Sequence, residues 1–201
     1  MEMTPIATLY TFIAKLLQRQ RSINESADST ASLVYAEATL LHQMIRPQLE
    51  SFPAQIVVVG PTQAGKSTVT NLLTGTDSAV ASALAGYTRH PQGFTTNEIS
   101  PQLYAEVGSL LAGLTPTPME KLSDQELNAF SLTELSADSN PLSSSAIIWD
   151  TPDFDSVSSR SYRYAVPKVC AIADAIVMVV SKEKYADQTV WETLRLVMQL
   201  P

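Results

Sequence analysis

Two stretches near the N-terminus have apolar residues at helical spacing. Apolar side chains recur every three or four positions over residues 4–20 and again over residues 33–45, whereas the polar stretch 22–32 has no such period. This spacing places the apolar side chains on one face of each helix. We therefore predict a helical hairpin over residues 1–52, with a turn in the polar stretch and with the apolar faces packed together or onto the rest of the chain.

From residue 53 onward, short and uniformly apolar runs alternate with helical segments. Such runs are typical of parallel strands buried on both faces, and the alternation predicts a parallel sheet with ligands at the carboxyl ends of its strands. The predicted strands are Ile56–Val59, Ala146–Trp149 and Ala175–Val180, and the predicted helices are Lys66–Leu73 and Gln188–Met198. We expect residues 53–201 to form one α/β domain.

Residues 109–145 break this alternation. They contain the proline pair of Thr115–Pro118, a helical pattern near Ser123–Phe130 and a polar loop over Ser139–Ser145. Prolines and clusters of Ser and Asn are typical of loops. We interpret this segment as an insertion between core strands.

The first predicted strand runs directly into a glycine-rich loop. Residues 60–67 fit the pattern G-x-x-x-x-G-K-[ST], and helix-forming residues follow. In this pattern the glycines allow a tight turn with inward-facing amides, the lysine reaches the β- and γ-phosphates, and the last hydroxyl binds Mg²⁺. The predicted nucleotide-binding residues are Gly60, Pro61, Thr62, Gln63, Ala64, Gly65, Lys66, Ser67 and Thr68.

Two later segments supply the other parts expected of a nucleotide-dependent switch. A predicted strand delivers Asp150 to its carboxyl end, where the carboxylate can hold a Mg²⁺-bound water. A switch also needs a threonine whose hydroxyl meets the metal and whose segment is released after hydrolysis. Thr88 is our first candidate, with Thr95 and Thr96 as alternatives. The predicted metal site therefore consists of Ser67, Thr88 and Asp150.

Three short motifs together resemble one class of P-loop GTPases. Ala64-Gly65-Lys66-Ser67, Thr88-Arg89-x-Pro91 and Asp150-x-Pro152 are similar to motifs of the translation-factor class, especially its bacterial dynamin-like and Era-like branch with domains of the 50S ribosome-binding type. The resemblance covers residues 55–200. It implies a three-layer P-loop NTPase fold that binds GTP or GDP with Mg²⁺ and hydrolyses GTP as a conformational switch. It also implies an N-terminal helical bundle, self-association through the nucleotide domain or through these helices, and contact with a protein or membrane.

The third motif of that class usually reads Asp-x-x-Gly, but here Asp153 stands at the glycine. An acidic side chain near the phosphates is unfavourable unless it points away or meets Mg²⁺. Phe154 follows, where Ras-like enzymes have a water-orienting glutamine. Dynamins place the catalytic polar group in the phosphate loop, so the resemblance implies slow hydrolysis or hydrolysis stimulated by a partner or by self-association. The candidate catalytic residues are Lys66, Thr88, Gln63 and Thr62, and Asp153 is a further candidate nucleotide contact.

Guanine specificity normally comes from the motif [NT]-K-x-D. The similar stretch Ser181–Lys184 ends in lysine and follows a strand that lies one strand too early. We expect the chain to end before the last core strands and the base-reading segment. The resemblance alone therefore implies GTP rather than ATP.

Composition excludes some classes of function and indicates where the protein is located. The net charge of −7 argues against general binding of nucleic acid, which needs a basic surface. The single cysteine, Cys170, excludes a disulfide within the chain, and its apolar neighbours favour a buried side chain over a nucleophile. Without a signal-peptide pattern or a membrane-spanning run, we expect a cytoplasmic protein. Peripheral membrane binding through residues 4–20 is the alternative, although few lysines and arginines support it.

Two other functions share the phosphate loop. An ATP-dependent small-molecule kinase would need arginines in a lid, and residues 109–145 contain none. A nucleotide-binding interaction module without hydrolysis is favoured if Asp153 and Phe154 impair catalysis.

Overall fold

The computed structural model describes residues 4–23, 27–79, 88–122, 128–136, 138, 142, 145–154 and 164–198. Its helices are α1 Pro5–Ile23, α2 Ala27–Ile45, α3 Lys66–Thr74, α4 Pro101–Leu110, α5 Ala165–Ala171 and α6 Gln188–Met198, with short 3₁₀ helices at Arg46–Gln48 and Met119–Lys121. Its strands are β1 Ala54–Val59, β2 Gln92–Thr95, β3 Thr115–Pro116, β4 Ala129–Glu134, β5 Ala146–Asp150 and β6 Ala175–Met178.

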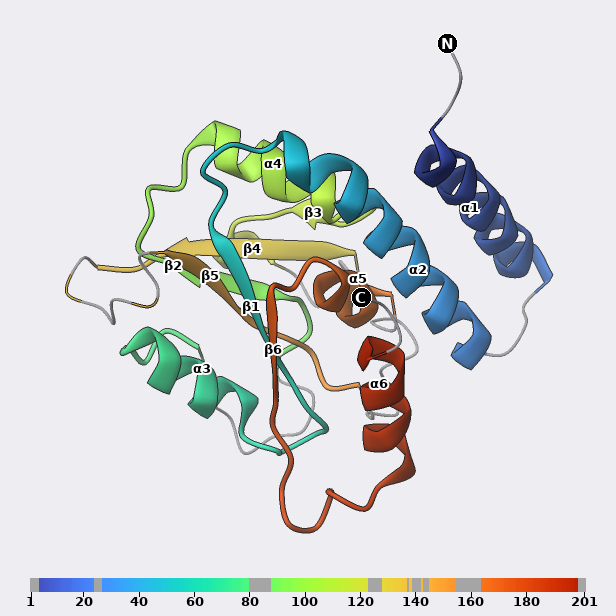
Figure 1. Ribbon diagram of the computed structural model, residues 1–201. Coiled ribbons are helices and arrows are strands. Elements are labelled where there is room, and N and C mark those ends of the chain that lie inside the picture. The colour runs from blue at the N-terminus through green and yellow to red at the C-terminus, as the bar shows by residue number, and fades with distance from the viewer. Residues whose placement is uncertain are drawn as a thin grey trace.

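These elements form three layers, with helices on both faces of a mostly parallel sheet (Figure 1). Helix α3 lies on one face, whereas α2, α4 and α5 lie on the other. The α/β P-loop NTPase fold predicted from the sequence is therefore confirmed. No described helix has the length and hydrophobicity that crossing a bilayer requires.

The order of the strands positions the site. The sheet runs β3-β4-β2-β5-β1-β6, so β1 lies between β5 and β6. Neighbouring strands pair in parallel except β2 and β5, which are antiparallel. The register of β1 on β5 sets Val58 opposite Asp150. Because parallel strands end at the same edge, the loops that follow β1 and β5 lie side by side.

Strand β5 is held in this register by the packing of Trp149. The indole Nε1 donates a 2.8 Å hydrogen bond to Oε1 of Gln55, and the ring meets Phe130 edge to face with centroids 6.1 Å apart. On the other side of β5, Gly93 of β2 lies opposite Trp149. A Cβ at Gly93 would lie 2.7 Å from a methyl carbon of Leu132, so the close packing there needs glycine.

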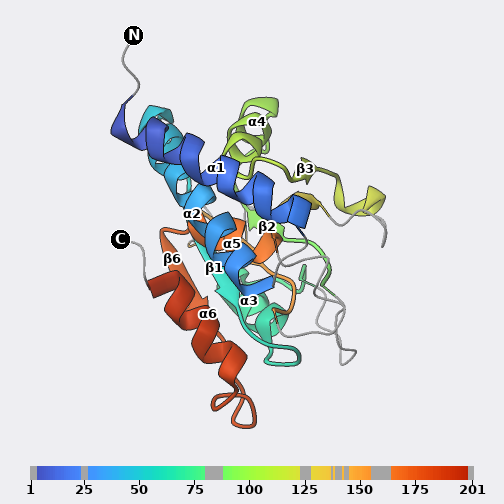
Figure 2. The ribbon, with the colours of Figure 1, turned by 90° about the vertical axis from the view of Figure 1, so that its right-hand side faces the viewer.

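The two predicted N-terminal helices are present, and α2 shares a core with the sheet. Helix α1 packs on α2, which packs on α5, and Figure 2 shows α1 outermost on that side. Tyr35 and Ala38 of α2 belong to the same buried cluster as Val57 of β1. Helix α2 begins at Ala27, earlier than predicted, because polar residues are favourable in a first turn and leave no apolar period there. Residues 24–26 lie outside the described part of the chain.

Residues 109–145 do not interrupt the sheet but add strands β3 and β4 to one of its edges. Ala129 and Phe130, predicted to end a helix, lie in β4. The periodicity of a short apolar run is compatible with either a helix or a strand. Here the segment is a strand because it pairs with β2 and β3. Residues 123–127 and most of the predicted loop 139–145 lie outside the described residues.

Candidate functional site

The loop between β1 and α3 has the conformation that its glycines allow. Gly65 has a φ of 93°, which favours glycine, and Gln63 has a φ of 60°. At Gly60 the reason is space, because an added Cβ would lie 2.3 Å from the carbonyl oxygen of Val179. Helix α3 begins directly after the loop, at Lys66, so the positive end of its dipole faces the loop. This arrangement suits anionic groups.

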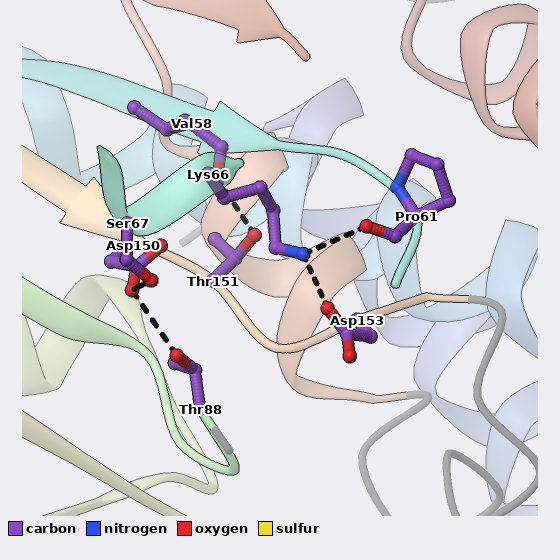
Figure 3. Close-up of polar contacts among 8 residues, drawn as sticks. All are labelled: Val58, Pro61, Lys66, Ser67, Thr88, Asp150, Thr151 and Asp153. Atoms are coloured by element: carbon purple, nitrogen blue, oxygen red, sulfur yellow. Dashed lines mark hydrogen bonds and ion pairs between the residues drawn. The ribbon is translucent and has the colours of Figure 1, made fainter. Parts of the chain in front are cut away.

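Lys66 folds back over the loop (Figure 3). Its Nζ donates a hydrogen bond to the carbonyl oxygen of Pro61 at 3.1 Å and forms an ion pair with Oδ1 of Asp153. Both side chains of the pair are largely buried, with 5% of the lysine and 11% of the aspartate exposed. The ammonium group therefore lies inside the site, between the glycine-rich loop and the turn after β5.

Asp150 ends β5 and is fully buried. Its Oδ2 accepts hydrogen bonds from Oγ of Ser67 at 2.7 Å and from Oγ1 of Thr88 at 3.2 Å (Figure 3). Its Oδ1 has no hydrogen-bond partner among the described residues. Burial raises the pKa of this carboxyl group, while the Ser67 hydrogen bond, the charge of Lys66 and the Thr88 hydrogen bond oppose the shift. The three residues predicted to form a metal site thus meet at one carboxylate.

The chemistry of these oxygens fits Mg²⁺. Two hydroxyls and a carboxylate are the hard oxygen donors that this cation prefers, and the buried Oδ1 of Asp150 is an acceptor left over for it or for its water. In the described part of the chain, no group of three His, Cys, Asp or Glu side chains could hold a metal by itself. A cation here would therefore depend on Ser67, Thr88 and Asp150 together with other oxygens.

Two contacts that position the site were not foreseen from the sequence. Thr151 is buried and its Oγ1 donates a 2.7 Å hydrogen bond to the carbonyl oxygen of Val58, which ties the turn after β5 to β1. Val179, just after β6, donates its amide to Val59 at 2.8 Å and closes over Gly60. The sequence Asp-Thr-Pro is typical of a turn, but no local pattern reveals a partner on another strand.

The other predicted loop residues have unequal surroundings. The carbonyl oxygen of Pro61 also accepts a 3.3 Å hydrogen bond from the amide of Ala64, which closes a turn within the loop. Thr62 is half-buried, whereas the side chains of Gln63 and Thr68 are exposed. The Thr68 side chain therefore faces away from the protein interior.

The alternatives to Thr88 do not reach Asp150. Thr95 is buried at the end of β2, where its Oγ1 accepts a hydrogen bond from the amide of Asn97 at 3.1 Å. The Oγ1 of Thr96 is buried without a hydrogen-bond partner among the described residues. Among these three threonines, Thr88 is the one whose hydroxyl contacts the Asp150 carboxylate.

Cys170 lies fully inside the core, as its apolar neighbours predicted. Burial raises the pKa of its thiol to about 12, so the thiolate needed for nucleophilic chemistry does not form near neutral pH. His90 is also buried and belongs to no candidate metal cluster of the described residues.

A family model described as 50S ribosome-binding GTPase matches residues 55–199. The chain belongs to this family. Searches of curated proteins and of solved structures found no match.

The matched range begins in β1 and includes the glycine-rich loop and the Asp150 turn. Membership of a P-loop GTPase family supports GTP and GDP as ligands and GTP hydrolysis as the general activity. It favours these over the kinase alternative. In this 50S ribosome-binding GTPase domain, the site lies at the carboxyl ends of β1 and β5, where ligands of α/β proteins bind. It contains the glycine-rich loop, Lys66, Ser67 and Asp150.

Proposed function

We propose that this domain is a Mg²⁺-dependent GTPase switch of the dynamin-like or Era-like type. The observation that carries the proposal is the convergence of the Ser67 and Thr88 hydroxyls on one oxygen of buried Asp150, whose other oxygen has no hydrogen-bond partner among the described residues. These residues come from three separate segments. A shared metal ion would offset the cost of burying a carboxylate there.

In this proposal each group has one task. The amides of residues 60–67 and the ammonium of Lys66 bind the phosphates, while Ser67, Thr88 and Asp150 hold Mg²⁺ or its water. The cation would neutralise phosphate charge and so assist cleavage. Thr62 and Gln63 are the candidates to orient the attacking water, and the Thr88 and Asp153 segments would respond to the terminal phosphate.

The test combines nucleotide binding with hydrolysis. We expect a fluorescent GTP analogue to bind the complete protein with Mg²⁺, Lys66→Ala to weaken binding at least about tenfold, and Ser67→Asn to remove most of its Mg²⁺ dependence. Unlabelled GTP, but not ATP at equal concentration, should displace the analogue. Binding that is unchanged in both variants, or equal displacement by ATP, would contradict the proposal.

A module that binds GTP without hydrolysing it is the second candidate. Asp153 favours it, because its carboxylate contacts the lysine that should assist phosphate transfer. Single-turnover assays with γ-labelled GTP distinguish the two functions. Phosphate release no faster than in Lys66→Ala, at equal nucleotide occupancy, would favour the module.

We further propose that the protein is cytoplasmic and self-associates or meets a protein partner through its N-terminal helices. On α1, Ile6, Leu9 and Phe12 are 39%, 49% and 57% exposed, and they follow one another at helical spacing. Sedimentation analysis with GDP and with a non-hydrolysable GTP analogue tests self-association. Vesicles of anionic lipid test the alternative, a peripheral membrane contact, which Leu9→Ser with Phe12→Ser should abolish if it exists.

A further inference from the structure

Asp153 stands where its GTPase class usually has glycine, and its carboxylate contacts the lysine of the phosphate loop. A glycine would leave this ammonium to the phosphates. Here Oδ1 of Asp153 and the carbonyl oxygen of Pro61 both accept from Nζ of Lys66. The carboxylate of Asp153 thus lies beside the ammonium group of Lys66, which in the proposed function binds the terminal phosphates.

The fold positions the ion pair of Lys66 with Asp153, which is not a contact between exposed side chains. Thr151 anchors the turn to β1 through the carbonyl of Val58, and Asp153 follows two residues later. The charged pair is largely buried. Charges at such positions interact more strongly than exposed ones, because less solvent screens them.

A carboxylate and a γ-phosphate cannot both approach the same ammonium without repelling each other. A diphosphate has no γ-phosphate, so its binding leaves the Asp153 contact less disturbed. The lysine also reaches the β-phosphate, but the added γ-phosphate makes the cost of moving Asp153 away larger for a triphosphate than for a diphosphate.

We propose that Asp153 is an internal competitor for Lys66 that shifts the preference of the domain from GTP towards GDP. This inference rests on the proposed function, because it assumes that guanine nucleotides occupy the loop. Asp153 then acts as a specificity-determining residue.

The experiment compares the dissociation constants of a fluorescent GDP and of a fluorescent, non-hydrolysable GTP analogue, both with Mg²⁺. We measure them for the complete protein and for Asp153→Asn, which keeps the shape but removes the charge, and Asp153→Gly, which restores the residue usual in the class. Asp77→Asn is the matched control, since it makes the same change of charge at an exposed position beyond the far end of α3.

We expect both Asp153 variants to tighten triphosphate binding relative to diphosphate binding by a factor on the order of ten. Asp77→Asn should leave the ratio within about twofold of wild type. Circular dichroism melting checks that every variant is folded.

An unchanged ratio in folded Asp153→Asn and Asp153→Gly would overturn the inference. So would weaker triphosphate binding in Asp153→Asn that depends on Mg²⁺, because Asp153 would then be a metal ligand. Failure of wild-type protein to bind either nucleotide overturns the proposed function and this inference together, whereas binding with an unchanged ratio overturns the inference alone.

Discussion

Asp150 is a buried residue whose charge opposes folding and which, in the proposed function, helps to hold Mg²⁺. Its side chain is fully buried, and burial raises the pKa of the carboxyl group. The hydrogen bond from Ser67 and the charge of Lys66 offset this only in part. A bound divalent cation would favour the charged form more strongly than either.

We expect Asp150→Asn to stabilise the protein by about 1 kcal/mol at neutral pH without Mg²⁺ and nucleotide, while weakening Mg²⁺-dependent GTP binding at least about tenfold. Because the folded-state pKa is raised, protonated Asp150 contributes stability below its ordinary pKa of 3.8, and this contribution is lost as the pH rises through the raised pKa. The advantage of the variant should therefore grow with pH above 3.8 in urea unfolding. A constant difference across that range would contradict this account.

The choice of Thr88 over Thr95 can be tested in the same way. Thr88→Ala removes a hydroxyl that contacts Asp150 and should weaken GTP-analogue binding about tenfold with little change in melting temperature. Thr95→Ala removes the acceptor for the Asn97 amide and should cost about 1 kcal/mol of stability with little effect on nucleotide affinity. The reverse pattern in binding and unfolding experiments would make Thr95 the switch residue.

At the scale of elements, the junction of β1, the phosphate loop and α3 is set by backbone geometry. Gly60 allows the loop to pass the carbonyl of Val179, and Gly65 takes a left-handed conformation before the first turn of α3. Gly75, at φ 68°, ends α3 and donates its amide to the carbonyl of Asn71. Glycines therefore define both ends of the helix that carries Lys66 and Ser67.

Gly60→Ala should destabilise the protein by about 1–3 kcal/mol, because the new methyl group must displace the chain after β6. Gly108→Ala is the matched control, since an added Cβ inside α4 would meet nothing within 4 Å. It should stabilise the protein by about 0.5–1 kcal/mol through the higher helix propensity of alanine. Urea unfolding measures both, and equal effects would exclude close approach as the reason for Gly60.

At the scale of the whole molecule, the second N-terminal helix and the sheet share one core. Helix α2 contributes Tyr35 and Ala38 to the cluster that contains Val57 and Val169. The hydroxyl of Tyr35 also donates a hydrogen bond to the carbonyl oxygen of Val197 in α6, at 3.2 Å. These contacts cross the domain limit predicted near residue 52. That limit stays a prediction, and the unfolding of separate fragments tests it.

We expect a fragment that begins at residue 53 to be unfolded or aggregated, because removal of α2 exposes the apolar faces of α5 and α4. Removal of α1 alone should leave a folded protein with a lower melting temperature, since α1 packs on α2 and contributes buried Leu17. Circular dichroism melts of both fragments test this. A residue 53 fragment that melts like the complete chain would show two independent domains.

The sequence alone determined the features that short-range chemistry specifies. The glycine-rich pattern after a uniform apolar run was sufficient to predict the loop and the start of α3 at Lys66, because both ends of that motif lie within a few residues of each other. The functions assigned to Lys66 and Ser67 stay predictions. Asp150 was predicted because it directly follows an apolar strand. Both N-terminal helices followed from their apolar spacing.

Only the tertiary structure decided which segments meet. Strand β2 was not predicted, because Pro91 and Gly93 weaken its local signal, yet the packing of Trp149 needs that glycine. Strand β4 was mistaken in part for a helix, since its state depends on distant strands. The ion pair of Lys66 with Asp153 joins residues 87 positions apart, and contacts of that kind depend on strand order and register, which no local pattern contains.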